Sequence, residues 1–139
     1  MKADELKSYL AAVDLFQGLS KRQLNALVKE GRETVHADGQ EVIAEGTGAI
    51  GFHLITSGKA RVTTGSAVRR TLGVGDYFGE ISVLDGKPRS ASVVADGELT
   101  TFAIRPHVLE ALMEGNPNFA RQLLVVLCAR LREAESRLG

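Results

Sequence analysis

The amino-acid sequence predicts a mainly β domain with helices at both ends of the chain. Through the middle of the chain, glycines recur every 7–12 residues, and short runs of β-branched residues lie between them. Such evenly spaced turn signals predict a β-sandwich or jelly roll. Apolar residues at helical spacing precede this section and follow it. We therefore expect one domain over residues 1–139, with N-terminal helices (1–30), a jelly roll (31–104) and C-terminal helices (105–139).

Composition and charge exclude several classes of function. The 17 basic and 17 acidic residues cancel, so the basic surface of a typical nucleic-acid binder is missing and no direct nucleic-acid contact is expected. No apolar run reaches about 18 residues and no secretion signal is present, so we expect a cytoplasmic chain without a membrane span. The single cysteine, Cys128, predicts no disulfide and is expected to be a small buried residue. Three scattered histidines give no metal-ligand spacing, so neither a metal nor another cofactor is expected.

The N-terminal section predicts two short helices. Leucine and valine recur at helical spacing in residues 3–13, which favours a first amphipathic helix. After a turn, Ser20 and Gln23 stand in the positions of a capping box and begin a second helix. Gly31 marks its end, and the strand pattern starts there.

The glycine-rich middle section predicts short strands. Residues 50–56 and 59–64 flank Ser57-Gly58, which is typical of a hairpin. A later strand is expected to end at the turn Asp96-Gly97. Arg69 and Arg70 are adjacent in a strand, so their side chains point to opposite faces. Either one of them faces a ligand, or both lie in solvent at a loop edge.

Residues 75–96, which read GDYFGEISVLDGKPRSASVVAD, carry the chemistry. Gly79 has no side chain, so backbone N–H groups can approach a ligand closely, and the start of the helical turn that follows favours an anion. Arg89 can present a planar fork to a phosphate beside the hydroxyl of Ser90. The carboxylate of Glu80 would repel a phosphate but can accept hydrogen bonds from sugar hydroxyls. Together they predict a nucleotide site, and the alternative is an internal ion pair between Glu80 and Arg89.

The runs FGEISVL, DGK and PRSASV over residues 78–93 resemble the phosphate-binding cassette of the cyclic-nucleotide-binding domain family. The resemblance implies an eight-stranded jelly roll with N-terminal helices and two C-terminal helices, and a ligand that is cyclic AMP or cyclic GMP. Serine at position 90, where threonine often accompanies cyclic GMP, favours cyclic AMP. Val62 aligns with a residue that contacts the base or sugar, although a strand residue there also belongs to the core. Within the cassette, the resemblance implies six ligand contacts: Gly79, Glu80, Ile81, Ser82, Arg89 and Ser90.

The last helix, expected from about residue 118 to 137, carries two apolar stripes. One has the 4-3-4-3-4 spacing of a short coiled coil: Ala120, Leu124, Leu127, Leu131, Ala134 and Leu138. It could pair two subunits, as in related transcription regulators, or pack against the barrel. Beside it, Leu123, Val126 and Arg130 form a second stripe. The resemblance implies that this helix closes over the nucleotide and that Arg130 contacts the base, while a surface position would give Arg130 no such role.

Two functions of different classes fit the sequence. The first is a sensor or regulatory module whose cyclic nucleotide moves the C-terminal helix. The second is a nucleotide-free interaction or dimerisation domain of the same fold. A phosphodiesterase would need a metal or an activated water, and no cluster of histidines and carboxylates supplies one, so we expect no enzyme and no catalytic residues. Expected partners are the nucleotide and either a second copy or an effector domain; whether the chain is full length or a fragment is open.

Overall fold

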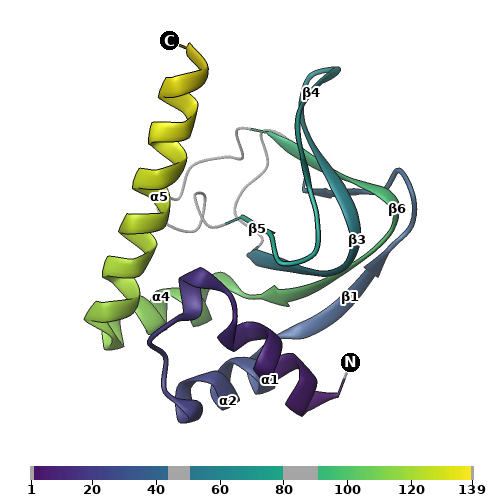
Figure 1. The fold of residues 1–139 in the computed structure, drawn as a ribbon. Coiled ribbons are helices and arrows are strands. Elements are labelled where there is room, and N and C mark those ends of the chain that lie inside the picture. The colour runs from purple at the N-terminus through teal and green to yellow at the C-terminus, as the bar shows by residue number, and fades with distance from the viewer. Residues whose placement is uncertain (1, 44–50, 80–90, 139) are drawn as a thin grey trace. The chain divides into compact units, whose positions relative to one another are not determined.

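The elements of the computed structural model follow the predicted order of helices, strands and helices (Figure 1). The structure describes residues 2–43, 51–79 and 91–138. Contacts divide the chain into two compact units, Met1–Lys29 with Ala111–Gly139, and Glu30–Glu110. The prediction of a single domain stays a prediction. In chain order the elements are α1 (Ala3–Ala11), η1 (Asp14–Phe16), α2 (Lys21–Glu30), β1 (Arg32–His36), β2 (Glu41–Ile43), β3 (Phe52–Thr64), β4 (Ala67–Leu72), β5 (Tyr77–Phe78), β6 (Ser92–Ile104), α4 (Pro106–Gly115) and α5 (Pro117–Leu138).

The β unit is built on two long antiparallel strands, β3 and β6, which run side by side and curve together (Figure 1). The sheet order is β1-β6-β3-β4, with β2 added on β6 and β5 added on β3. All of these pairs are antiparallel. The mainly β architecture with helices is therefore confirmed. The described residues form a six-stranded sheet, and the expected eight strands of a jelly roll stay a prediction.

Two predicted chain reversals are wrong, because glycine forms a bulge at each place instead of a turn. β3 continues through Ser57-Gly58 and stays paired with β6, with register shifts on both sides of Ser57. Gly58 has a φ of +88°, which extra residues in a paired strand often require. In the same way, β6 continues through Asp96-Gly97, where Gly97 has a φ of +79°. The hairpin of this region instead joins β3 to β4 across Gly65 and Ser66.

The sheet buries both faces of its central strands, as alternating apolar residues require. One face carries a buried cluster of Ile55, Ala60, Leu72, Phe78, Val93, Ala95 and Leu99. The other face carries Phe52, Leu54, Phe102 and Ile104, each at most 1% exposed. Gly31 lets the chain pass over the Phe102 ring, since a Cβ there would lie 2.2 Å from the ring carbon Cζ.

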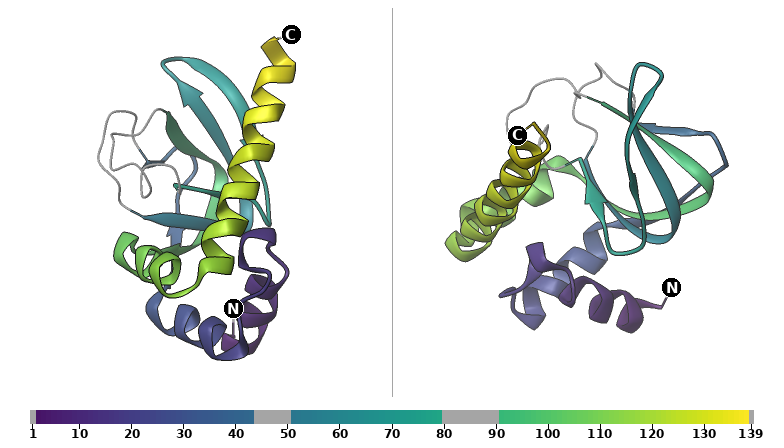
Figure 2. Two further views of the ribbon diagram at one scale, coloured as in Figure 1. Left: turned by 90° about the vertical axis from the view of Figure 1, so that its left-hand side faces the viewer. Right: turned by 45° about the horizontal axis from the view of Figure 1, so that its top comes forward.

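The helical unit forms as the sequence predicts. The capping box is confirmed: the Ser20 N–H donates to Gln23 Oε1 at 2.9 Å, and the Gln23 N–H donates to Ser20 Oγ at 3.1 Å. α5 is one uninterrupted helix of 22 residues (Figure 2). Near its start, the ring of Phe119 stacks on that of Phe16 with centroids 6.1 Å apart. This contact joins the last helix to the N-terminal segment.

Within the ranges that the structure describes, no helix is both long and apolar enough to cross a lipid bilayer.

Candidate functional site

The start of the predicted nucleotide segment is held on β3. β5 pairs with β3 so that His53 is opposite Phe78 and Leu54 is opposite Tyr77. The turn before β5 is fixed as well, because the Gly75 N–H donates to the Ile55 carbonyl at 3.0 Å and the Ile55 N–H donates to the Asp76 carbonyl at 2.9 Å. A carboxylate oxygen of Asp76 accepts from the Gly73 N–H at 2.8 Å, so this acid stabilises the turn.

The end of the same segment returns to β3. β6 begins at Ser92, which pairs with Thr63, and the next residue, Val93, pairs with Val62. The residues between the two anchors therefore form a connection whose ends are both hydrogen-bonded to one strand. The predicted contacts Glu80, Ile81, Ser82, Arg89 and Ser90 lie in this connection, outside the described residues.

Within the cassette, Gly79 is the predicted contact residue that the structure describes. It follows β5 directly, is half-buried and has a φ of +98°. An L-residue rarely adopts this φ, so glycine is required here by the backbone, besides its lack of a side chain. The missing side chain is visible in the sequence, whereas the positive φ is not.

Val62 lies on the face of the sheet that carries the buried cluster, and it is half-buried against that cluster. Val62 on β3 is paired with Arg70 on β4, so Arg70 shares this face of the sheet. Arg70 is also half-buried. Arg69 is on the opposite side, where its Nε donates to Thr64 Oγ1 at 2.5 Å. The prediction that both arginines lie at a solvent-exposed edge is thus wrong for Arg70, because strand alternation turns it toward Val62.

A group of polar side chains that sequence reasoning missed crosses three strands of the same sheet. We call the four residues His36, Thr34, Thr101 and His53 the histidine–threonine chain. Thr34 Oγ1 lies 3.0 Å from His36 Nε2 and 2.9 Å from Thr101 Oγ1, and Thr101 Oγ1 lies 3.0 Å from His53 Nδ1. The Thr34 and His36 spacing along β1 is visible in the sequence, but their pairing with β6 and β3 depends on register. Burial lowers the pKa of His36 below its ordinary value.

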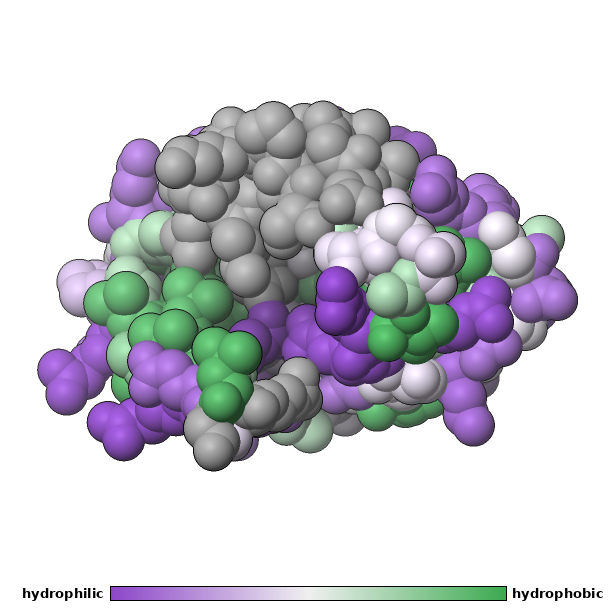
Figure 3. Space-filling view, turned by 90° about the horizontal axis from the view of Figure 1, so that it is seen from above, coloured by the Kyte–Doolittle hydropathy of each residue, from purple (hydrophilic) through white to green (hydrophobic). Residues whose placement is uncertain are grey.

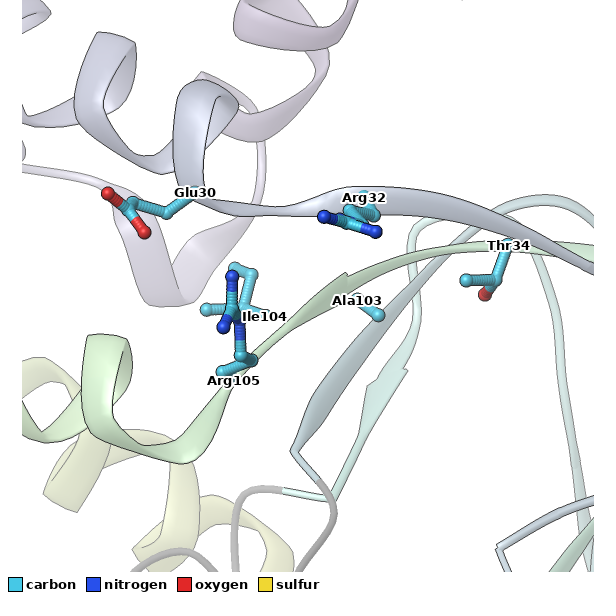
Figure 4. A pocket seen from close by; sticks show the side chains of 6 residues that line it. All are labelled: Glu30, Arg32, Thr34, Ala103, Ile104 and Arg105. Atoms are coloured by element: carbon cyan, nitrogen blue, oxygen red, sulfur yellow. The ribbon is translucent and has the colours of Figure 1, made fainter.

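An open hollow of about 340 Å³ lies beside Thr34 (Figure 4). Thr34 lines it together with the charged side chains of Glu30, Arg32 and Arg105. Thr34 thereby connects the histidine–threonine chain to solvent.

Residue Arg130 lies in the helical unit, where it is half-buried on α5. Leu123 and Val126 on the same stripe are buried, so this stripe is the packed side of the helix. Arg130 belongs to the helical unit, whereas Val62 and Gly79 belong to the β unit. Its role as a base contact stays a prediction.

The coiled-coil-like stripe of α5 is largely exposed. Hydrophobic residues gather at the left of the space-filling view, over α5 (Figure 3). Leu124 is 63% exposed, Leu131 60% and Leu138 90%. Cys128 is exposed as well, so the prediction of a buried cysteine is wrong: it lies beside Leu124 and Val125 on the outer side of the helix.

Across residues 2–43, 51–79 and 91–138, no three histidine, cysteine, aspartate or glutamate side chains come together in a way that could hold a metal ion.

The chain matches known proteins along most of its length. The family model for the cyclic nucleotide-binding domain matches residues 33–116. The chain is 30% identical over 135 residues to the CRP-like cAMP-activated global transcriptional regulator of Mycobacterium tuberculosis, in a match that covers 94% of this chain and 60% of the regulator. It is also 30% identical over 110 residues to the cGMP-dependent protein kinase of Plasmodium berghei, covering 78% of this chain and 13% of the kinase.

Among solved structures, the crystal structure of Thermus thermophilus Catabolite Activator Protein superposes with a TM-score of 0.78 at 31% identity. The match covers 90% of this chain and 61% of that protein. The chain therefore spans about 60% of the length of the bacterial regulators that it matches.

Proposed function

The chain belongs to the cyclic nucleotide-binding domain family, and we propose that residues 79–90 hold the phosphate and ribose of a 3′,5′-cyclic nucleotide. The proposal is supported above all by the two anchors on β3. Phe78 at one end and Ser92 at the other are paired with the same strand, so both ends of the segment with the predicted contacts are held on β3. Val62 and the apolar cluster lie beside one anchor and offer a surface for a base.

Each predicted contact has a separate chemical role. Arg89 pairs with a phosphate oxygen and Ser90 donates its hydroxyl to the phosphate. The backbone from Gly79 to Ser82 approaches the phosphate at the start of a helical turn. Glu80 accepts a hydrogen bond from the ribose 2′-hydroxyl.

We propose cyclic AMP as the preferred ligand, because position 90 is serine. The relatives include a cAMP-activated regulator and a cGMP-dependent kinase, so both nucleotides need testing.

The proposed output is a change in the position of α5. Arg130 would contact the base only when α5 is in place, so the nucleotide binds one arrangement of this helix more tightly than the other. The module is regulatory and not catalytic, and we propose that a cytoplasmic effector domain or protein reads the change. We propose no direct nucleic-acid contact for this chain; the regulator relative controls transcription, but this chain spans only 60% of it.

Cyclic nucleotide should raise the melting temperature of the chain by mass action. At a concentration one hundred times Kd, the stabilisation is about 2.7 kcal/mol, which corresponds to roughly 5–15 °C for a chain of this size. Differential scanning fluorimetry with cyclic AMP, cyclic GMP and 5′-AMP measures it, after unfolding and refolding the protein to remove any co-purified nucleotide. If neither cyclic nucleotide changes the melting temperature, the interaction-domain alternative replaces this function.

The exposed stripe of α5 supports a second proposal, that two copies of the chain pair through this helix. Leu124, Leu131 and Leu138 recur at seven-residue intervals and are exposed, as the interface of a short coiled coil requires. A surface of this kind also fits the interaction-domain alternative.

The substitution Leu131→Asp is expected to shift the chain from dimer toward monomer, because it places a charge in the apolar interface. Sedimentation velocity measures the change. Ser136→Asp adds the same charge on another side of the exposed helix end and should leave the dimer unchanged. A wild-type chain that sediments as a monomer at every concentration tested would contradict the pairing.

A further inference from the structure

Hydrogen bonding in the histidine–threonine chain includes a longer contact of 3.5 Å between Thr101 Oγ1 and His36 Nε2. Three short hydrogen bonds connect His36 to Thr34, Thr34 to Thr101, and Thr101 to His53. The two hydroxyls supply two hydrogens, so one ring N–H must supply the third. The tautomers of the two histidines are therefore linked through the hydroxyls.

A proton added to His36 conflicts with the hydrogen bonds around that ring. His36 Nδ1 is buried and has no hydrogen-bond partner among the residues that the structure describes. If neutral His36 donates to Thr34 through Nε2, a proton added at Nδ1 creates a buried N–H without an acceptor among the described residues. If His53 donates to Thr101 instead, Nδ1 already carries the hydrogen of neutral His36. A proton added at Nε2 then gives the three bonds four hydrogens, and one hydroxyl loses its acceptor. A buried donor without an acceptor is unfavourable.

The far end of the chain touches the predicted nucleotide site. The His53 ring stacks on the Phe78 ring, with centroids 5.1 Å apart and planes 7° apart. The backbones of these two residues are also paired between β3 and β5. Phe78 is 4% exposed and is followed directly by Gly79. The ring of His53 is thus fixed between the hydroxyl of Thr101 and the residue that begins the site.

Among the described residues, the charged groups around the histidine–threonine chain lie toward the hollow beside Thr34. On this face of the sheet, the neighbours from β3, β5 and β6 are Ile55, Phe78, Leu99 and Ala103, which are all uncharged. The charged groups near it line the hollow beside Thr34: Arg32 on β1, Glu30 and Arg105. The lowered pKa of His36 comes from burial, so a positive charge on this ring is unfavourable in itself. Solvent in the hollow reaches Thr34, which gives protons a route to the chain.

We infer that the histidine–threonine chain positions Phe78, and with it the Gly79 end of the nucleotide site, and that adding a proton to His36 lowers nucleotide affinity. The inference rests on the proposed function. It makes His36 and His53 positioning residues and gives the module a dependence on acid pH.

The folded chain should also lose stability in acid. Because the pKa of His36 is lowered on folding, the folded state binds fewer protons than the unfolded state just below pH 6.5. Stability therefore falls as the pH decreases from about 6.5 toward the folded-state pKa, and levels off below it. Thermal melts of wild type and His36→Gln between pH 5 and 8 measure this contribution as the difference between the two curves.

The decisive test is titration calorimetry with cyclic AMP and cyclic GMP at pH 7.5 and 5.5. Wild type should bind more weakly at pH 5.5. The loss should be less than the roughly tenfold change that an unshifted histidine gives one unit below its pKa, because the pKa of His36 is lowered. His36→Gln keeps an amide near the Nε2 position but does not titrate. The nucleotide affinity of this variant should therefore differ by less than about twofold between pH 7.5 and pH 5.5. His107→Gln replaces an exposed histidine of α4 and should keep the wild-type pH dependence.

Two substitutions at Thr101 separate positioning from general packing. Thr101→Val keeps the shape but removes the hydroxyl, and should weaken binding at pH 7.5 and flatten the pH dependence. Thr101→Ser keeps the hydroxyl and should restore both. Equal wild-type affinities at the two pH values, or the same pH dependence in His36→Gln, would overturn the inference alone. No heat from either nucleotide with folded, nucleotide-free protein would overturn the proposed function as well.

Discussion

Replacing Arg89 with alanine is expected to weaken cyclic nucleotide binding by about 30-fold to several thousand-fold. The arginine is the proposed partner of the phosphate, and removing one partner of a buried charge pair costs about 2–5 kcal/mol. Titration calorimetry of the full chain measures the loss. The melting temperature without ligand should change little, because the guanidinium serves the ligand and not the core.

Arg69→Ala is the matched control for this prediction. It removes an arginine from the exposed side of β4, where the only hydrogen bond given by its side chain in the described part of the chain is to Thr64. Its affinity should match wild type. If Arg89→Ala binds as tightly as wild type, the internal ion pair between Glu80 and Arg89 becomes the better account of the segment.

The substitution Gly58→Ala is expected to lower the free energy of unfolding by about 2–6 kcal/mol. A residue with a side chain at a φ of +88° costs about 1–3 kcal/mol, and overpacking adds about 1–3 kcal/mol. The added Cβ would lie 2.3 Å from the carbonyl oxygen of Glu98. That atom is part of the β6 backbone, so it cannot move aside without disturbing the long β3–β6 pair.

Gly65→Ala provides the comparison, since Gly65 also has a positive φ, of +59°, but a Cβ added there would meet no atom within 4 Å. Only the backbone cost of about 1–2 kcal/mol should remain. Urea unfolding measures the free energy of unfolding of both variants from the midpoint concentration, provided that the dependence of this free energy on urea is unchanged. Equal losses in the two variants would show that close contact with β6 does not determine the need for glycine at 58.

Elements with a local cause could be predicted from the sequence. The capping box at Ser20 and Gln23 depends on neighbouring residues, and it is confirmed. The turns predicted at Gly58 and Gly97 are wrong because a glycine with positive φ suits a hairpin turn and a bulge equally well. Only pairing with a distant strand distinguishes them, and that pairing is not visible in one local stretch.

In the candidate site, too, features with a local cause could be predicted and features that depend on strand register could not. Its residue types and spacing over 78–93 could be recognised, because each contact has a chemical reason that is local to the segment. The orientation of Arg70 and the meeting of His36 with His53 could not, since both depend on the register among β1, β6, β3 and β4. The burial predicted for Cys128 is wrong because the helical stripe that packs is the one with Leu123 and Val126.

Titration calorimetry on refolded, nucleotide-free wild-type protein tests whether this chain binds a cyclic nucleotide. Cyclic AMP, cyclic GMP and 5′-AMP are titrated separately at pH 7.5. The proposed site predicts saturable heat with a cyclic nucleotide, stronger for cyclic AMP, and much weaker binding of 5′-AMP. Absence of heat from all three, with the protein folded by circular dichroism, would contradict it.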